Sequence, residues 1–298
     1  MTYHTTVLLH EGVDALEVKP AGIYVDVTLG AGGHSNEILK RLGSDGRLLG
    51  FDQDADAVSN APADDRFELC FGNFRFLKQF LLAKGVFKVD GIIADLGVSG
   101  HHFDDAERGF SFRFDAPLDM RMNTSQEKNA MHVVNDYEVS ELIRIFKRYG
   151  ESAFAKPIAR MIDLQRIEKP IATTGDLVAI VESIVPERKV KGELAQIFQA
   201  IRIEVNEEML VLQEFLTQVP EVLNQGGKLV VLSYHSLEDR MVKHFLRSGN
   251  FDDTLEKDVF GNIIRPLDPQ GKVVVPSEVE VEVNPRARSA KMRIGVKR

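Results

Sequence analysis

The chain has 298 residues, of which 44% are hydrophobic and 28% are charged, and its formal net charge is −8. This length and composition suit one large domain or two ordinary ones with real cores. The acidic balance excludes a protein that coats nucleic acid through overall positive charge, so any such contact needs a local basic patch. The single cysteine, Cys70, excludes an intramolecular disulfide and a cysteine-rich zinc site, and it indicates a reducing compartment.

No stretch of the sequence approaches the ~20 apolar residues of a membrane span. The N-terminal segment also lacks the basic and apolar regions of a signal peptide. We therefore expect a cytoplasmic protein that makes no membrane contact.

Short apolar runs alternate with helical patterns through residues 22–96. The expected strands are residues 23–27, 48–52, 67–71 and 89–95, and the expected helices are 34–42, 53–60 and 74–84. This alternation predicts an α/β fold, with a doubly wound parallel sheet that is covered by helices on both faces.

The pattern changes after residue 100. Residues 136–220 are almost wholly helical, and strands are expected again at 228–233 and 290–296, with a helix at 237–247 between them. Residues 277–283 are ambiguous, because their Glu/Val alternation suggests a strand while Ser277 and Glu280 suggest a capped helix. The simplest organisation is one α/β domain, residues 1–103 and 205–298, with an inserted helical substrate-recognition domain at 104–204.

A glycine-rich loop follows the first expected strand. Gly30, Gly32 and Gly33 allow a tight turn and close approach to a ligand, and the helix that follows favours an anionic group at its start. Asp52 ends the second strand, where a carboxylate can accept hydrogen bonds from ribose hydroxyls. The pattern predicts an adenosine-containing cofactor, either NAD or S-adenosylmethionine, and the third glycine of a dinucleotide motif is replaced by Ser35.

Polar residues also follow the fourth and fifth expected strands. Asp95 ends one of them, and Tyr234 and His235 follow the other. Because ligands of open α/β sheets lie beyond the carboxyl ends of the strands, these residues predict a group-transfer site. Capping of the next helix accounts for Glu238 and Asp239 but not for Tyr234 and His235. A packed tyrosine and a hydrogen-bonded histidine are the structural alternatives for these two residues.

Several longer motifs together resemble the MraW (RsmH) family of methyltransferases. They run in family order from residue 4 to residue 293 and comprise His4 to Leu9, Gly30 to Ser35, Asp95 to Ser99, Glu107 to Phe112, Pro117 to Met122, Ser233 to Arg240 and Asn284 to Ala290. The resemblance implies a class I, Rossmann-like methyltransferase. It also implies S-adenosylmethionine-dependent methylation of the exocyclic N4 amine of a cytidine in the decoding region of 16S rRNA, with the small ribosomal subunit as partner.

The resemblance further implies the residues of the cofactor site. The expected contacts are Gly30, Gly32, Gly33, His34, Asp52, Phe74, Asp95 and His102. His102 stands where the family usually has Gln, and Ala116 stands where it usually has Gly. Asp95, Tyr234 and His235 are the expected catalytic residues. The loop that contains His101, His102, Asp104 and Asp105 is compatible with a metal site, but we expect none.

The chemistry of cytosine methylation agrees with the N4 amine as the acceptor. A cytosine amine is a weak nucleophile that needs a hydrogen-bond acceptor for alignment, and Asp95 can supply it. Methylation at carbon 5 would need a cysteine nucleophile, and Cys70 lies in an apolar run. Phe103, Phe110, Phe112 and Phe114 can stack on an unstacked base or fasten the inserted domain to the sheet.

Cations near the C-terminus are the clearest RNA-binding feature. Residues 284–298 contain no acid, and Arg286, Arg288 and Lys291 are the expected phosphate contacts there, with Arg121 in the inserted domain. Two alternatives stay open at this stage. An NAD-dependent oxidoreductase would ignore S-adenosylhomocysteine, and a non-catalytic RNA-binding factor would tolerate loss of Asp52 or Asp95. The sequence does not specify the oligomeric state.

Overall fold

The computed structural model describes residues 6–98 and 105–298. The chain forms two compact units, which are described separately below. The first unit comprises the residues up to Gly97 together with Met209–Arg298, and the second comprises Val98–Glu208. The divisions fall six residues before and four residues after the boundaries expected from the sequence.

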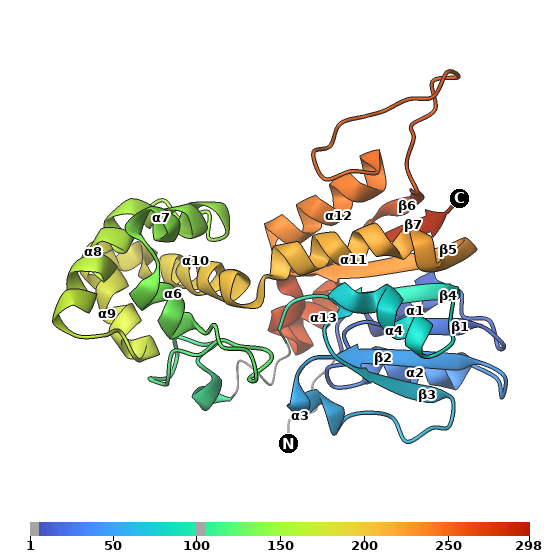
Figure 1. The fold of residues 1–298 in the computed structure, drawn as a ribbon, viewed down its shortest axis with the longest axis horizontal. Coiled ribbons are helices and arrows are strands. Elements are labelled where there is room, and N and C mark those ends of the chain that lie inside the picture. Colours follow the sequence, from blue (N-terminus) through green and yellow to red (C-terminus); the bar gives the residue numbers. More distant parts are fainter. Residues whose placement is uncertain (1–5, 99–104) are drawn as a thin grey trace. The chain divides into compact units, whose positions relative to one another are not determined.

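A seven-stranded sheet forms the centre of the first unit, with the strand order β3-β2-β1-β4-β5-β7-β6 (Figure 1). The strands are β1 (Ile23–Asp26), β2 (Arg47–Asp52), β3 (Phe67–Phe71), β4 (Val89–Asp95), β5 (Leu223–Ser233), β6 (Leu267–Val274) and β7 (Lys291–Lys297). Strands β1 to β5 pair in parallel, whereas β7 pairs antiparallel with both β5 and β6. The order reverses between β1 and β4, which is where open α/β sheets bind ligands.

Helices cover both faces of this sheet. They are α1 (Leu9–Leu16), α2 (Gly33–Arg41), α3 (Ala55–Val58), η1 (Phe74–Phe76), α4 (Leu77–Ala83), α11 (Glu208–Val222, whose first residue belongs to the second unit), α12 (Ser236–Ser248), α13 (Glu278–Val283) and η3 (Pro285–Ser289). Successive strand residues point to opposite faces. Val25 and Ile92 therefore pack with α4, α11 and α12, while Tyr24 and Ile93 pack with α1 and α2. The predicted doubly wound fold class is confirmed.

The second unit is helical and has its own hydrophobic core. Its elements are η2 (Ala106–Arg108), α6 (Ala130–Asp136), α7 (Val139–Arg148), α8 (Ala155–Glu168), α9 (Thr174–Ile184) and α10 (Glu187–Asn206). Each of the five longer helices buries an apolar stripe, represented by Val133, Ile145, Ile158, Leu177 and Ile197. Among the described residues, no helix is both long and apolar enough to cross a membrane.

Candidate active site

The carboxyl ends of β1, β2 and β4 each carry an aspartate, namely Asp26, Asp52 and Asp95. Parallel pairing of these three strands brings their ends to the same edge of the sheet, on either side of the point where the strand order reverses. The fold therefore gathers three carboxylates that are 26 and 43 positions apart in the sequence at one edge.

The glycine loop between β1 and α2 requires glycine at two positions for conformational reasons. Gly30 and Gly32 have φ angles of +49° and +75°, a region that side chains rarely adopt. A Cβ on Gly32 would also lie 3.0 Å from the carbonyl oxygen of Asn60, whereas a Cβ on Gly30 would meet nothing closer than 3.9 Å. The backbone at Gly30 thus borders open space, which suits the approach of a cofactor.

Gly33 is required for a different reason. A Cβ at this position would lie 1.8 Å from Oγ1 of Thr6, so the missing side chain makes room for the segment that precedes α1. Direct cofactor contact by Gly33 stays a prediction. The close approach of Thr6 is a packing requirement that the sequence pattern alone did not indicate.

Asp52 is held in place by backbone donors. Its Oδ2 accepts a hydrogen bond from the N–H of Gly30 at 2.9 Å, and its Oδ1 accepts one from the N–H of Asp54 at 2.9 Å. These bonds tie the end of β2 to the glycine loop and fix the plane of the carboxylate. A fixed carboxylate beside a glycine loop is the hydrogen-bond acceptor expected for the ribose hydroxyls of an adenosine cofactor.

Phe74 lies in η1, just beyond β3, and is half-buried. Its ring packs edge-to-face on Phe215 of α11 with centroids 5.3 Å apart. The sequence-based contact of Phe74 with adenine stays a prediction. The residues at this edge therefore fit S-adenosylmethionine, because the Asp52 carboxylate can accept from ribose hydroxyls and open space lies beside Gly30.

Asp95 at the end of β4 combines a perturbed environment with access to solvent. The Tyr234 hydroxyl donates to its Oδ1 at 2.7 Å, and its own N–H donates to Thr28 Oγ1 at 2.6 Å. Burial raises the pKa of Asp95 to about 6, although the nearby His34 and the Tyr234 hydrogen bond both oppose this shift. The side chain is still 22% exposed, so a substrate can reach it.

His34 lies behind Asp95, away from solvent. Its Nδ1 is 3.8 Å from Asp95 Oδ2, and its side chain is only 3% exposed. Burial lowers its pKa, with Asp95 opposing the shift, so the imidazole is neutral near pH 7. The predicted cofactor contact by His34 is untested, and the geometry shows that its imidazole neighbours the carboxylate of Asp95.

Tyr234 and His235 follow β5 as expected, but they point to different partners. His235 is the N-cap of α12: its Nδ1 accepts from the N–H of Glu238 at 3.4 Å, and its Nε2 lies 3.2 Å from Glu238 Oε1. Glu238 in turn accepts from the N–H groups of Tyr234 and His235. Capping therefore accounts for His235 as well as Glu238, and a catalytic role for His235 stays a prediction.

Asp239 does not serve as a cap. Its carboxylate pairs with Lys291 at 3.2 Å and with Arg293 at 2.7 Å, and both of these cations lie on β7. These ion pairs lower the pKa of Asp239 against the opposing effect of burial. Lys291, an expected RNA contact, is thus ion-paired, although its side chain is 46% exposed.

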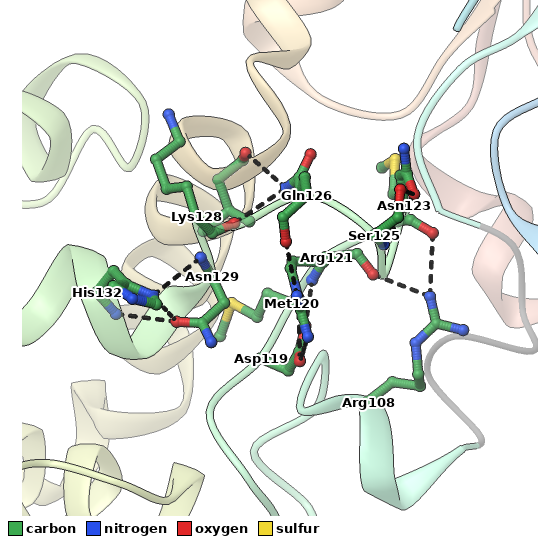
Figure 2. A network of polar contacts seen from close by, with 12 residues as sticks. Arg108, Asp119, Met120, Arg121, Asn123, Ser125, Gln126, Lys128, Asn129 and His132 are labelled. Atoms are coloured by element: carbon green, nitrogen blue, oxygen red, sulfur yellow. Dashed lines mark hydrogen bonds and ion pairs between the residues drawn. The ribbon is translucent and has the colours of Figure 1, made fainter. Parts of the chain in front are cut away.

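The other expected RNA contacts lie in two different environments. Arg286 and Arg288 are exposed on η3. Arg121 lies in the helical unit, where its guanidinium binds both carboxylate oxygens of Asp119 and donates to the carbonyl of Gln126 at 2.6 Å (Figure 2). The geometry gives Arg121 a role within its own loop.

The aromatic residues of the helical unit also differ in environment. Phe110 is buried in that unit's core, Phe112 packs edge-to-face on Phe198 at 5.5 Å, and Phe114 is 49% exposed. His102 and Phe103 lie outside the described residues, as do His101 and Asp104 of the loop that is compatible with a metal site.

The sequence pattern missed a group of residues beneath the glycine loop. Asp26 is buried, and its carboxylate accepts from Ser35 Oγ at 2.7 Å and from the N–H of Thr28 at 3.1 Å. Burial raises the pKa of Asp26. The signal was present in the sequence, because an acid as the last residue of a buried strand needs partners.

Comparison with known proteins places this site in a family. A family model described as the MraW methylase family matches residues 1–298. The chain belongs to this family. It is 54% identical over 297 residues to a protein of Flavobacterium johnsoniae, covering 100% of this chain and 98% of that protein. It is 52% identical to a protein of Parabacteroides distasonis, covering 99% and 97%. Both relatives are named ribosomal RNA small subunit methyltransferase H.

The solved structures are more distant. A structure titled as a putative rRNA methylase from Clostridium thermocellum covers 99% of each chain at 12% identity with a TM-score of 0.45. This likeness adds no argument to the family assignment. Membership of a methylase family confirms the resemblance seen in the sequence and decides against the NAD-dependent oxidoreductase.

Proposed function

We propose that this protein methylates small-subunit ribosomal RNA with S-adenosylmethionine as methyl donor, and that the acceptor is the exocyclic N4 amine of a cytidine in the decoding region of 16S rRNA. The names of the relatives support the reaction and the RNA class. The choice of a cytosine amine rests on the family resemblance and on the environment of Asp95.

When bound, S-adenosylmethionine supplies an electrophilic methyl group on sulfur. The glycine loop and Asp52 would hold the adenosine portion, and Phe74 would contact the adenine. Methyl transfer to a cytosine amine then depends on how well the protein aligns a weak nucleophile.

Asp95 carries the proposed chemistry. A carboxylate at the end of β4, oriented by Tyr234 and still 22% exposed, can accept a hydrogen bond from the amine and direct its lone pair. As the nitrogen–carbon bond forms, the amine loses one proton, and a carboxylate with a pKa of about 6 can receive it. Aligning the amine and receiving its proton both require the ionised form of Asp95.

The environment of Cys70 argues against methylation at carbon 5. That reaction needs a thiolate nucleophile. Cys70 is 1% exposed within the core, and burial raises its pKa to about 11. The chain contains no second cysteine.

The helical unit and the basic C-terminal segment are the proposed RNA-recognition parts. Arg286 and Arg288 are exposed cations on η3, and Lys291 lies near them at the start of β7. Phosphate contacts of this kind position an RNA without reading its sequence. Arg121, whose guanidinium is engaged by Asp119 and Gln126, would stabilise the helical unit rather than contact phosphate.

The test is methyl transfer from labelled S-adenosylmethionine to small subunits, and to free 16S rRNA, that lack the modification. Mass spectrometry of the digested nucleosides should show N4-methylcytidine at one site. Asp95→Asn should reduce the rate by about 10²–10⁴-fold because it removes the ionisable acceptor. Asp90→Asn, in the same strand at its other end, is the matched control and should keep the activity. Label in 5-methylcytidine, or full activity of Asp95→Asn, would contradict the proposal.

A further inference from the structure

Helix α12 presents a surface whose exposed side chains beyond the first turn are all cationic. The exposed residues of α12 are Ser236, Arg240, Lys243 and Arg247, which are spaced four, three and four residues apart. This spacing places them on one stripe along the helix. The two acids of the helix are buried: Glu238 accepts from backbone N–H groups at the start of the helix, and Asp239 pairs with cations of β7.

This arrangement is unusual for a solvated helix face. A surface helix without a partner mixes charges of both signs, and oppositely charged residues three or four apart then stabilise it. Here the chain has 45 acids against 37 Lys and Arg residues, yet the exposed positions of α12 after its first turn carry positive charge only. The segregation points to an anionic partner.

A second basic segment lies beside the first turn of α12. Lys291 and Arg293 of β7 pair with Asp239 of α12. Strand β7 packs against this helix, and Figure 1 shows α12 next to β6 and β7. The buried Asp239 therefore holds two basic segments, about fifty residues apart in the sequence, next to each other.

The position of this surface relates it to the candidate active site. α12 begins directly after Tyr234, which donates to Asp95, and runs back along the sheet. From Arg240 to Arg247 the helix rises about 10.5 Å, which corresponds to the length of about three nucleotides along one strand of a duplex. At the far end of α12, Asp253 pairs with Arg247 at 3.0 Å and lies 3.8 Å from His244.

We infer that the exposed face of α12, together with Lys291, is a phosphate-binding track for the RNA strand next to the methylated base. This inference rests on the proposed function and assigns phosphate contacts to Arg240, Lys243 and Arg247, none of which is among the RNA contacts expected from the sequence. The backbone of the bound strand follows α12 away from Asp95, and Arg240, Lys243 and Arg247 contact its phosphates.

The test measures binding of a synthetic RNA with the sequence of the 16S decoding region over a range of salt concentrations. The triple variant Arg240→Gln/Lys243→Gln/Arg247→Gln should reduce the slope of log affinity against log salt by about 2, since each lost contact on a single strand contributes about 0.7. Affinity at about 100 mM salt should fall at least tenfold. Lys243→Glu alone should weaken binding several-fold, and it tests the same track if the triple variant does not fold.

The matched control is Lys19→Gln/Lys40→Gln/Lys84→Gln, which removes the same charge from three exposed positions elsewhere in this unit. Binding of S-adenosylhomocysteine should be unchanged in all variants, because none of these residues belongs to the cofactor site. Equal weakening in the α12 and control variants, or an unchanged salt slope in the α12 variants, would overturn the inference. Absence of methyl transfer by the wild-type protein would instead overturn the proposed function, so the two failures are distinguishable.

Discussion

At the scale of single residues, the environment of Asp95 is set by opposing effects. Burial favours its neutral form, while His34 and the Tyr234 hydroxyl favour its ionised form, and burial has the larger effect. The result is a pKa of about 6, close enough to neutrality for the group to accept a proton during the reaction and to be ionised before it.

Tyr234→Phe should therefore shift the acidic limb of the pH profile. Loss of the donated hydrogen bond raises the pKa of Asp95 above 6, so the protonated, inactive form persists to higher pH. We expect kcat/KM for S-adenosylmethionine to fall more at pH 6.5 than at pH 8.5, with the limb moved upward by about one pH unit. Rates measured from pH 5.5 to 9 check this. An equal loss at every pH would show that Tyr234 does not act through Asp95.

The sequence predicted where Asp95, Tyr234 and His235 lie along the chain but not which side chains they contact. Asp95 and Tyr234 were predicted as strand-end polar groups, and both lie there. That the Tyr234 hydroxyl meets the Asp95 carboxylate, while His235 turns to cap α12, depends on the direction in which each residue leaves the end of β5. No pattern in the sequence specifies that direction.

At the scale of elements, one segment with an ambiguous pattern and one unexpected strand show how far local sequence signals determine secondary structure. Residues 278–283 form the helix α13 with Ser277 as its N-cap, because Ser277 Oγ accepts from the N–H of Glu280 and the Glu280 carboxylate accepts from the N–H of Leu8. The cap motif was the correct signal. Strand β6 was missed because Pro269 and Gly271 indicate a loop, and its pairing with β7 overrides that preference at the sheet edge.

The loop around Arg121 provides the prediction at this scale. Arg121 bridges Asp119 and Gln126, and Arg108 donates to the carbonyls of Arg121 and Met122 (Figure 2). Arg121→Lys keeps the charge but loses the paired hydrogen bonds to Asp119. We expect the helical unit to lose about 1–3 kcal/mol of stability, measured by thermal or urea unfolding.

The control for this variant is Arg113→Lys, at an exposed arginine of the same unit, which should leave stability unchanged. RNA affinity measured below the unfolding transition should be the same in both variants. If Arg121→Lys weakened RNA binding without lowering stability, Arg121 would be a phosphate contact as the sequence suggested.

At the scale of the whole molecule, the two units have separate hydrophobic cores. The core of the helical unit contains buried residues from Phe110 to Val205 only, and the cores on the two faces of the sheet contain none of them. A unit with its own core can unfold on its own.

Calorimetry of the full chain should therefore show two unfolding transitions. S-adenosylhomocysteine at about 100 times its Kd should stabilise the unit that contains Asp52 and Asp95 by about 2.7 kcal/mol. For a unit of this size that corresponds to an increase of about 5–10 °C in one Tm. The other transition should stay in place. A single transition, or an equal increase in both, would show that the units unfold together.

The sequence by itself determined the fold class, the glycine loop, the strand-end acids and the family. These follow from the periodic spacing of apolar residues, from the positive φ angles that glycine allows, and from motifs of residues close together in the chain. All of these are local properties of the sequence. It also placed six of the seven strands, and five of these are parallel strands, which are apolar along most of their length when buried on both faces.

Only the tertiary structure decided which of these residues meet. Asp26 is surrounded by Ser35 and Thr28, Thr6 fills the space beside Gly33, and Asp239 joins α12 to β7. Each relation depends on side-chain direction or on contacts between segments far apart in the chain. Such contacts are set by the packing of the assembled sheet and helices, and a local pattern contains no information about them.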